Sequence, residues 1–302
     1  MFSKELGGTG VQIPEIGMGT WQYHAGPQAL QAGLEAGALF IDTAESYGTE
    51  PVVADAICGG RDRVFLATKV SPQHFRRADL LSALDASLGR LRTDYVDLYQ
   101  LHKPNDAIPL AETLGAMEDA VDAGKVRFIG VSNFSLPQLQ QAQDAMRRHP
   151  IVSNQVRFNL IDRAIRDDLL PFCQAHRITI IAYSPLARGV QHIVDSDQQG
   201  ALTTVASETG RTPIQVALNW CVSPPGVVAI PKGNSADHVL EACGASGWRL
   251  DPEQIRELEQ SITFRRRSGM EEFLRQHLPP GGKTAIQRLA RHLPRAVRSR
   301  IH

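Results

Sequence analysis

The chain has 302 residues, enough for one large domain or two ordinary ones, and its formal net charge is zero. A neutral chain has no overall field that would attract nucleic acid, so we expect no nucleic-acid partner. Its four cysteines have no metal-type spacing, which predicts four buried or partly buried free thiols and no metal site. The N-terminus has no signal pattern, and no apolar run approaches the roughly 20 residues of a membrane span, so we expect a cytoplasmic protein.

Strand-like and helix-like segments alternate along most of the chain. We expect strands at residues 15–21, 39–46, 64–70, 95–102, 126–133, 152–159, 178–185 and 226–232. We expect helices at residues 27–37, 50–58, 77–90, 110–123, 135–148, 166–176, 200–222 and 235–243. The strand segments are apolar on both faces, which is typical of parallel strands covered by helices. Eight such units predict an α/β fold of the (β/α)8 TIM-barrel type.

The first residues predict a short addition to that barrel. Residues 2–14 suggest a β-hairpin below it. The alternative, a doubly wound sheet, would need a glycine-rich turn between its first strand and first helix. The Gly-Gly-Thr-Gly run at 7–10 follows no strand and opens no helix, so the barrel is favoured. We assign residues 1–263 to the barrel domain.

Four polar residues stand at the ends of successive strand segments: Asp42, Tyr47, Lys69 and His102. A parallel barrel gathers the carboxyl ends of its strands at one mouth, so these side chains should meet there. A lysine ammonium close to a tyrosine should lower the tyrosine pKa from about 10 and make it a better acid at neutral pH. Asp42 would hold Lys69, and His102 would donate to a carbonyl oxygen. No Ser or Cys nucleophile with a paired base is evident, so we expect hydride from a nicotinamide to attack the carbon.

Several sequence blocks then resemble one known family. FIDTAESYG, FLATKV, YVDLYQLHKP, IGVSNF, NQVRFN, AYSPLARG and AIPKGNS are similar to blocks of the aldo-keto reductase superfamily, in that family's order, between residue 5 and about residue 262. The resemblance implies a barrel without a separate dinucleotide-binding domain. It also implies reduction of small aldehydes and ketones by NADPH, with NADH as the alternative, in a monomer. Tyr47 would be the general acid, supported by Lys69 and Asp42, and His102 would orient the substrate.

The same resemblance implies a set of cofactor contacts. The nicotinamide carboxamide would be bound by Ser132, Asn133 and Gln155, and its ring would stack on Tyr183. The nicotinamide ribose would lie near Thr20, and the pyrophosphate would pass along Ser184, Leu186 and Arg188. The adenosine end would be held by Lys232, Asn234, Ser235, His238 and Glu241. Trp21 and Lys103 would line the substrate pocket.

The chain departs from the family pattern at the adenosine end. Gly233 stands where the family commonly has a hydroxyl residue, and His238 stands where it commonly has an arginine. An arginine grips phosphate with two parallel hydrogen bonds and a permanent charge, which a histidine does not. The choice between NADPH and NADH therefore stays open. At the mouth, Lys103 replaces a frequent aromatic residue, so anionic substrates and a solvent-facing lysine are both compatible with the sequence.

Residues 264–302 form a basic extension that does not resemble the usual end of the family. Residues 265–302 hold ten Arg or Lys against two Glu, a net of +8, which leaves −8 on the first 264. Apolar residues near helical spacing predict a short amphipathic helical segment. We expect a tail that packs on its own domain or is partly disordered. Contact with an anionic membrane or an acidic partner, or a cap over the substrate pocket, are the alternatives.

Two other functions remain compatible with the sequence. A barrel lyase would use Lys69 or Lys232 as a Schiff base, which requires a lysine that readily loses its proton. A regulatory subunit would bind the nicotinamide cofactor without turning it over. The physiological substrate, the direction of reaction and the oligomeric state cannot be read from the sequence.

Overall fold

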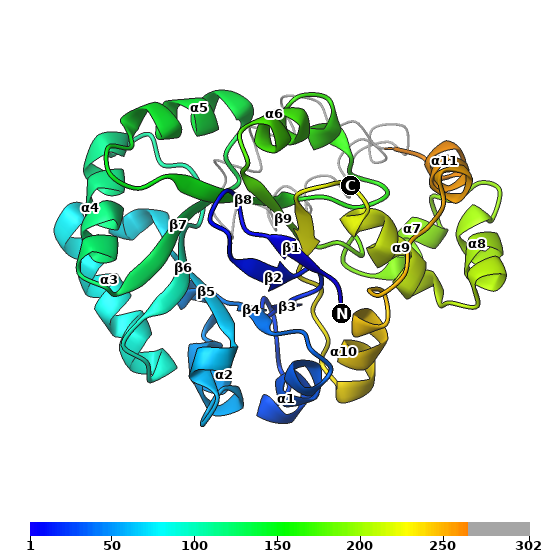
Figure 1. Ribbon diagram of the computed structural model, residues 1–302, viewed down its shortest axis with the longest axis horizontal. Coiled ribbons are helices and arrows are strands. Elements are labelled where there is room, and N and C mark those ends of the chain that lie inside the picture. Colours follow the sequence, from blue (N-terminus) through cyan, green and yellow to red (C-terminus); the bar gives the residue numbers. More distant parts are fainter. Residues whose placement is uncertain (265–302) are drawn as a thin grey trace, which may run out of the picture. The chain divides into compact units, whose positions relative to one another are not determined.

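The computed structural model describes residues 1–264, which form a barrel of parallel strands surrounded by helices (Figure 1). The barrel strands are β3 (Met18–Gly19), β4 (Phe40–Asp42), β5 (Phe65–Val70), β6 (Val96–Leu101), β7 (Val126–Ser132), β8 (Ile151–Arg157), β9 (Thr179–Tyr183) and β10 (Val227–Ala229). They pair in chain order, and every pair is parallel. All eight predicted strands are confirmed.

The first and last strands meet and close the barrel. Ile16, just before β3, forms a parallel bridge with Ala229 of β10. The Gly19 amide donates to the Pro231 carbonyl at 3.0 Å. A β-carbon on Gly19 would lie 2.7 Å from the Ile230 carbonyl oxygen, so this close approach of two backbones requires glycine. The predicted (β/α)8 barrel is therefore confirmed.

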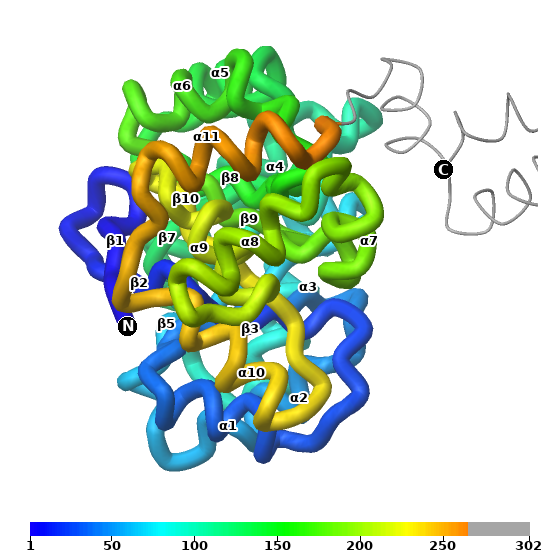
Figure 2. Tube along the Cα trace, turned by 90° about the vertical axis from the view of Figure 1, so that its right-hand side faces the viewer, coloured from blue at the N-terminus to red at the C-terminus, as the bar shows by residue number. Residues whose placement is uncertain are grey.

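The helices lie outside the strands (Figures 1 and 2). They are α1 (Pro27–Glu35), α2 (Glu50–Ala56), α3 (Arg77–Leu91), α4 (Leu110–Asp122), α5 (Leu136–Ala145), α6 (Leu169–Ala175), α7 (Val190–Val194), α8 (Ala201–Thr209), α9 (Pro213–Val222), α10 (Ala236–Cys243) and α11 (Pro252–Ser261). Apolar side chains fill the layer between helices and strands, and a second apolar cluster fills the inside of the barrel. Burying this apolar surface supplies most of the folding free energy.

The predicted hairpin is present and covers one end of the barrel. It consists of β1 (Ser3–Glu5) and β2 (Gln12–Pro14), which pair antiparallel. Leu6 and Ile13 are fully buried and belong to the cluster inside the barrel. The Gly7 amide donates to the hydroxyl of Thr179 at 2.7 Å. Thr179 begins β9, so the hairpin lies at the amino ends of the strands and leaves the carboxyl ends open.

One predicted helix, 200–222, was wrong, because the chain turns between two shorter helices. Gly210 follows α8 in the left-handed region, with φ of 62°, and ends that helix. Thr212 then caps α9 in a reciprocal capping box with Gln215, and Pro213 occupies the first helical turn. Both signals stand in the sequence. Helices α7 and α11 were not predicted.

The described residues give further outcomes. Within residues 1–264, no helix is long and apolar enough to cross a membrane, and no group of three His, Cys, Asp or Glu side chains could hold a metal ion. The four cysteines are free thiols, but the expectation that all are at least partly buried was wrong for Cys58, which is exposed. The basic extension predicted from residue 264 lies, from residue 265 onward, outside the described residues.

Candidate active site

A buried ion pair lies at the carboxyl ends of β4 and β5. Lys69 is fully buried, and its ammonium donates to Asp42 Oδ1 at 2.5 Å and to the Thr43 carbonyl at 2.8 Å. Asp42 ends β4 and is only 2% exposed. Each buried charge is therefore compensated by its partner and by further hydrogen bonds, as a buried pair requires.

The second oxygen of Asp42 is held by two side-chain amides from across the barrel. Gln155 Nε2, on β8, donates to Asp42 Oδ2 at 2.7 Å. Gln100 Nε2, on β6, donates to the same oxygen at 3.1 Å. The two amides also contact each other, with 3.3 Å between Gln155 Nε2 and Gln100 Oε1. The carboxylate is thus fixed from both sides.

Tyr47 and His102 stand above this ion pair. Tyr47 is the last residue of a 3-10 turn, Glu45–Tyr47, which is separated from the end of β4 by two residues. Its hydroxyl lies 3.3 Å from His102 Nε2, and the Lys69 ammonium lies 5.0 Å from the centre of its ring. The structure therefore brings together all four residues that the sequence selected, Asp42 included.

The acidity of Tyr47 differs from the expectation. Burial raises the pKa of the Tyr47 phenol, and the nearby Lys69 ammonium lowers it by less, so the pKa lies above its usual value. The predicted lowering by Lys69 was wrong in its net direction, because the sequence does not show how strongly the hydroxyl is desolvated. Tyr47 consequently keeps its proton at neutral pH and can give it to a reacting oxygen.

The other two titratable groups have fixed charge states. Burial lowers the pKa of Lys69, but Asp42 and Tyr47 together raise it by more, so the pKa lies above its usual value and the lysine stays charged. Burial, together with the nearby charges of Lys69 and Lys103, lowers the pKa of His102 to about 3. His102 is therefore a neutral imidazole with one N–H to donate, a suitable group to polarise a carbonyl oxygen.

A second polar group lies at the ends of β7, β8 and β9. Asn133, in the left-handed region with φ of 62°, donates to the His102 carbonyl at 3.1 Å and accepts from the Tyr183 hydroxyl at 2.9 Å. Ser132 donates to the Gln155 carbonyl at 2.9 Å. These contacts connect the residues predicted for the carboxamide to each other and to His102. They fix the rotamers of Asn133 and Tyr183 at the mouth.

The loop after β9 has an unusual backbone. Ser184, Ala187, Arg188 and Gly189 all have positive φ, with values of 48°, 55°, 71° and 150°. Two amides of the loop donate within it, Ala187 to the Ser184 carbonyl at 2.9 Å and Gly189 to the Leu186 carbonyl at 2.8 Å, which holds this backbone shape. Leu186 in the same loop is half-buried. The pyrophosphate contact expected for Ser184, Leu186 and Arg188 stays a prediction.

Two loops meet at the mouth near β3 and β10. The Lys232 ammonium donates to the Gln22 carbonyl at 3.2 Å. The His24 amide donates to the Asn234 side chain at 3.2 Å. The segment that follows β10 is therefore attached to the segment that follows β3 by hydrogen bonds at exposed positions.

The start of α10 carries the remaining predicted cofactor residues. Ser235 caps the helix, accepting from the His238 amide at 3.3 Å. His238 is exposed, and Glu241 is half-buried one turn further on. A β-carbon on Gly233 would lie 2.7 Å from the Val239 side chain and 2.9 Å from its backbone nitrogen. The missing hydroxyl at this position therefore has a steric reason.

Trp21, Lys103 and Thr20 differ in their surroundings. Trp21 is 42% exposed, and the Arg188 guanidinium lies 5.3 Å from the centre of its ring. Lys103 is exposed, directly after His102. Thr20 is fully buried, and its hydroxyl bonds the Asp42 carbonyl at 3.1 Å. Trp21 and Lys103 are thus accessible to a substrate, whereas Thr20 braces the backbone below.

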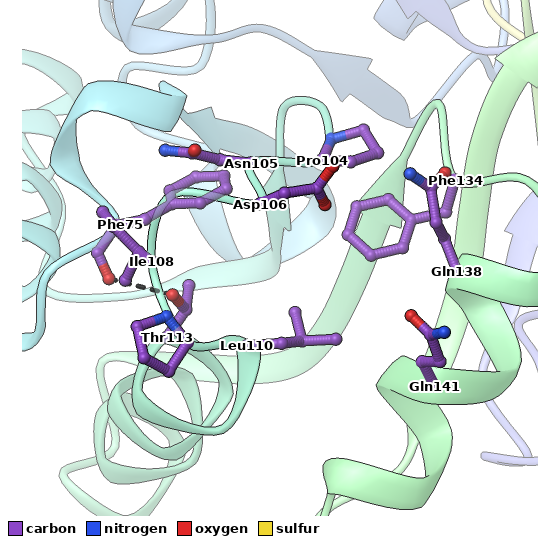
Figure 3. A pocket seen from close by; sticks show the side chains of 11 residues that line it. Phe75, Pro104, Asn105, Asp106, Ile108, Leu110, Thr113, Phe134, Gln138 and Gln141 are labelled. Carbon is purple, nitrogen blue, oxygen red and sulfur yellow. Dashed lines mark hydrogen bonds between the residues drawn. The ribbon is translucent and has the colours of Figure 1, made fainter.

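A cavity of about 240 Å³ lies beside the mouth, behind the loop that follows His102 (Figure 3). Its lining includes Phe75, Asn105, Leu110, Phe134 and Gln141. The Thr113 hydroxyl in its wall donates to the Phe75 carbonyl at 3.0 Å. This cavity was not expected from the sequence.

Sequence reasoning also missed Gln100. This glutamine lies on β6 two residues before His102, which directly follows the strand, so the period-2 alternation of strand side chains could have found it. A fully buried glutamine inside a barrel needs hydrogen-bond partners, and Asp42 and Gln155 are the partners it has.

Comparison with known proteins identifies the family. The sequence model of the aldo/keto reductase family matches residues 15–263, so the chain belongs to this family. Methylglyoxal reductase YeaE of Escherichia coli is 36% identical over 261 residues, which span 83% of this chain and 92% of that protein.

Solved structures agree with this assignment. A thermostable aldo-keto reductase in complex with the inhibitor epalrestat has a TM-score of 0.81 at 40% identity, covering 86% of this chain and 99% of the other. An aldo/keto reductase of Klebsiella pneumoniae, in complex with NADP and acetate, has a TM-score of 0.81 at 38% identity and covers 89% and 98% of the two chains. The protein is an oxidoreductase of the aldo-keto reductase type.

Proposed function

We propose that the protein reduces small aldehydes and ketones to alcohols with NADPH, using Tyr47 as the proton donor. The observation that carries the proposal is the arrangement of a protonated Tyr47 and a neutral His102, 3.3 Å apart, above the Lys69–Asp42 ion pair. Tyr47 in this arrangement can protonate a carbonyl oxygen, a step that a protein which only binds the cofactor would not need.

The side chains of this site divide the reaction between them. Bound reduced nicotinamide supplies the hydride that attacks the carbonyl carbon. The His102 N–H orients the carbonyl oxygen and stabilises the charge that develops there. Tyr47 gives its proton to that oxygen, and the charged Lys69 stabilises the tyrosinate that remains. Asp42 keeps Lys69 charged and in place.

The residues present fit a nicotinamide dinucleotide. Ser132, Asn133 and Gln155 offer hydroxyl and amide groups at adjacent strand ends, which suits a carboxamide. The exposed Lys232 offers a cation to a phosphate, and the loop after β9 is the segment that we propose for the pyrophosphate. The Klebsiella pneumoniae relative in complex with NADP supports the same cofactor here. NADPH is the proposed cofactor, and NADH is the alternative.

The relatives narrow the substrate class. Two curated relatives, YeaE of Escherichia coli and DkgB of Salmonella typhimurium, are named methylglyoxal reductases. We therefore propose small aldehydes, including 2-oxoaldehydes, as substrates. The Schiff-base alternative is weakened, because Asp42 keeps Lys69 protonated and an ammonium cannot attack a carbonyl. Cytoplasmic location and a monomeric state remain part of the proposal.

Replacement of Tyr47 by phenylalanine tests the proposal. Aldehyde-dependent oxidation of NADPH should fall about 10³-fold in Tyr47→Phe, since general acid catalysis is worth roughly 10²–10⁴. The dissociation constant for NADPH, measured by fluorescence titration, should stay within about twofold. An unmodified protein that binds NADPH but reduces none of a broad panel of aldehydes would instead support a regulatory subunit. Undiminished turnover in Tyr47→Phe would remove Tyr47 as the acid.

A further inference from the structure

Gln100 lies close to the active site but has no direct part in the proposed hydride and proton transfer. It is fully buried inside the barrel, on β6, and its backbone lies in register with Lys69 of β5 on one side and Gly130 of β7 on the other. A β-carbon on Gly130 would lie 3.0 Å from Gln100 Cγ, so glycine at that position leaves room for the glutamine side chain. The backbone of the neighbouring strand thus accommodates this side chain.

Both polar atoms of the Gln100 amide are engaged with the site. Its nitrogen donates to Asp42 Oδ2 at 3.1 Å, and its oxygen lies 3.3 Å from Gln155 Nε2. An ionised carboxylate can only accept hydrogen bonds, so Asp42 requires the nitrogen side of both glutamine amides. The orientation of the Gln100 amide therefore follows from chemistry and has no flipped alternative with the same partners.

The two carboxylate oxygens of Asp42 have different hydrogen-bond partners. Oδ1 contacts the Lys69 ammonium at 2.5 Å, and Oδ2 is occupied by the two amides at 2.7 and 3.1 Å. With Oδ2 held, rotation of the carboxylate is restricted and Oδ1 stays on Lys69. The Lys69 ammonium in turn lies 5.0 Å from the centre of the Tyr47 ring. A displacement of Asp42 would therefore displace Lys69 and change the surroundings of the proton donor Tyr47.

We infer that Gln100 is a positioning residue of the reductase, whose amide locks the Asp42 carboxylate on Lys69 and so keeps Tyr47 in place for proton transfer. The inference rests on the proposed function. The hydrogen bonds of the Gln100 side chain are to Asp42 and Gln155, so we infer that it acts on Tyr47 through Asp42. Hydrogen bonds to charged groups are among the stronger ones in proteins, so the effect should be measurable.

Two variants test the inference by single-turnover hydride transfer from NADPH. Gln100→Leu keeps a similar volume but removes both hydrogen bonds, and the transfer rate should fall about 10- to 100-fold. The dissociation constant for NADPH should change by less than about twofold, which separates positioning of the acid from loss of cofactor binding.

Gln100→Glu gives a signature that a purely structural role would not produce. A protonated glutamic acid can donate to Asp42 Oδ2 through its hydroxyl and accept from Gln155 through its carbonyl, as the amide does. An ionised one repels Asp42. The transfer rate of this variant, divided by that of the unmodified protein, should therefore fall as the pH rises from about 5 to about 9, with the midpoint above the ordinary glutamate pKa of about 4.3.

Ser153→Ala is the matched control. Ser153 lies inside the barrel on β8, and its buried hydroxyl has no hydrogen-bond partner among the described residues. Its removal should leave the transfer rate within about twofold. A folded Gln100→Leu protein that transfers hydride as fast as the unmodified protein would overturn the inference. If Gln100→Leu does not fold, a pH-independent ratio for Gln100→Glu would overturn it. An unmodified protein without any aldehyde reduction would contradict the proposed function itself, a result distinguishable from either outcome.

Discussion

The two ends of the proposed cofactor site are built in different ways. At the catalytic end, Asp42 and Lys69 are buried and each makes two or more hydrogen bonds within the barrel. At the adenosine end, Lys232, Asn234 and His238 are exposed. Lys232 and Asn234 are each attached to a neighbouring loop by one hydrogen bond of 3.2 Å.

This contrast separates chemistry from cofactor selection. Proton transfer depends on groups whose charge and position are set by the low dielectric of the barrel interior, so a change there should affect both the fold and the rate. Grip on a 2′-phosphate depends on exposed cations, so a change there should affect affinity and leave the fold intact. The chain departs from the family pattern at this second, exposed end, at Gly233 and His238.

The largest effect is expected from breaking the buried ion pair. Lys69→Met leaves Asp42 without a cation in the barrel and should lower the free energy of unfolding by about 3–5 kcal/mol. Turnover should fall with it, because Tyr47 loses the charge that stabilises its ionised form. Chemical denaturation and steady-state kinetics measure the two effects.

The double variant Asp42→Asn with Lys69→Met is the control for this experiment. It removes both charges while asparagine still accepts a hydrogen bond from the glutamine amides. It should recover stability relative to Lys69→Met and should not recover activity. A single variant as stable as the unmodified protein would show that the pair is not desolvated as the structure indicates.

An intermediate effect is expected at the adenosine end. His238→Arg restores a guanidinium on α10 and should lower the dissociation constant for NADPH about tenfold without changing that for NADH. Leu240→Arg is the matched control. Leu240 is 46% exposed, and because it lies two residues after His238 it projects from α10 about 200° around the helix axis from His238. Equal gains for both nucleotides would show only a non-specific charge effect.

The smallest effect is expected at the mouth. Lys103→Ala should reduce the preference for an anionic over a neutral aldehyde by about two- to fivefold in kcat/KM, the size typical of an exposed charge pair. Lys125→Ala controls for net charge, because Lys125 precedes β7 at the opposite end of the barrel. An unchanged ratio would remove Lys103 from substrate selection.

The fold could be predicted because its signals are local. Each strand lies in a short apolar run, and in several runs a polar residue at or near the end marks the carboxyl edge, as Lys69 does in FLATKV. The error at residues 200–222 came from joining two apolar-periodic segments across Gly210 and Thr212-Pro213, which are a stop and a start signal. Helix α11 follows a similar signal, with Asp251 as its cap and Pro252 in its first turn.

The site was less predictable where it depends on contacts between strands. The tetrad could be selected because each member lies at a strand end, but the part played by Gln100 depends on two residues from other strands. The direction of the Tyr47 pKa shift could not be found either. It depends on a balance between burial and the Lys69 charge, and no sequence pattern gives the extent of burial.

The pH dependence of single-turnover reduction tests the central claim that Tyr47 is a protonated acid beside a neutral His102. Reduction needs the protonated phenol, and its pKa lies above the usual value of about 10. The rate should therefore be flat from about pH 5 to about pH 9 and fall only as the pH rises through that raised pKa. His102, with a pKa of about 3, should add no change in this range. A fall in rate centred between pH 6 and 7, lost on replacing His102, would contradict the account and make the histidine the acid.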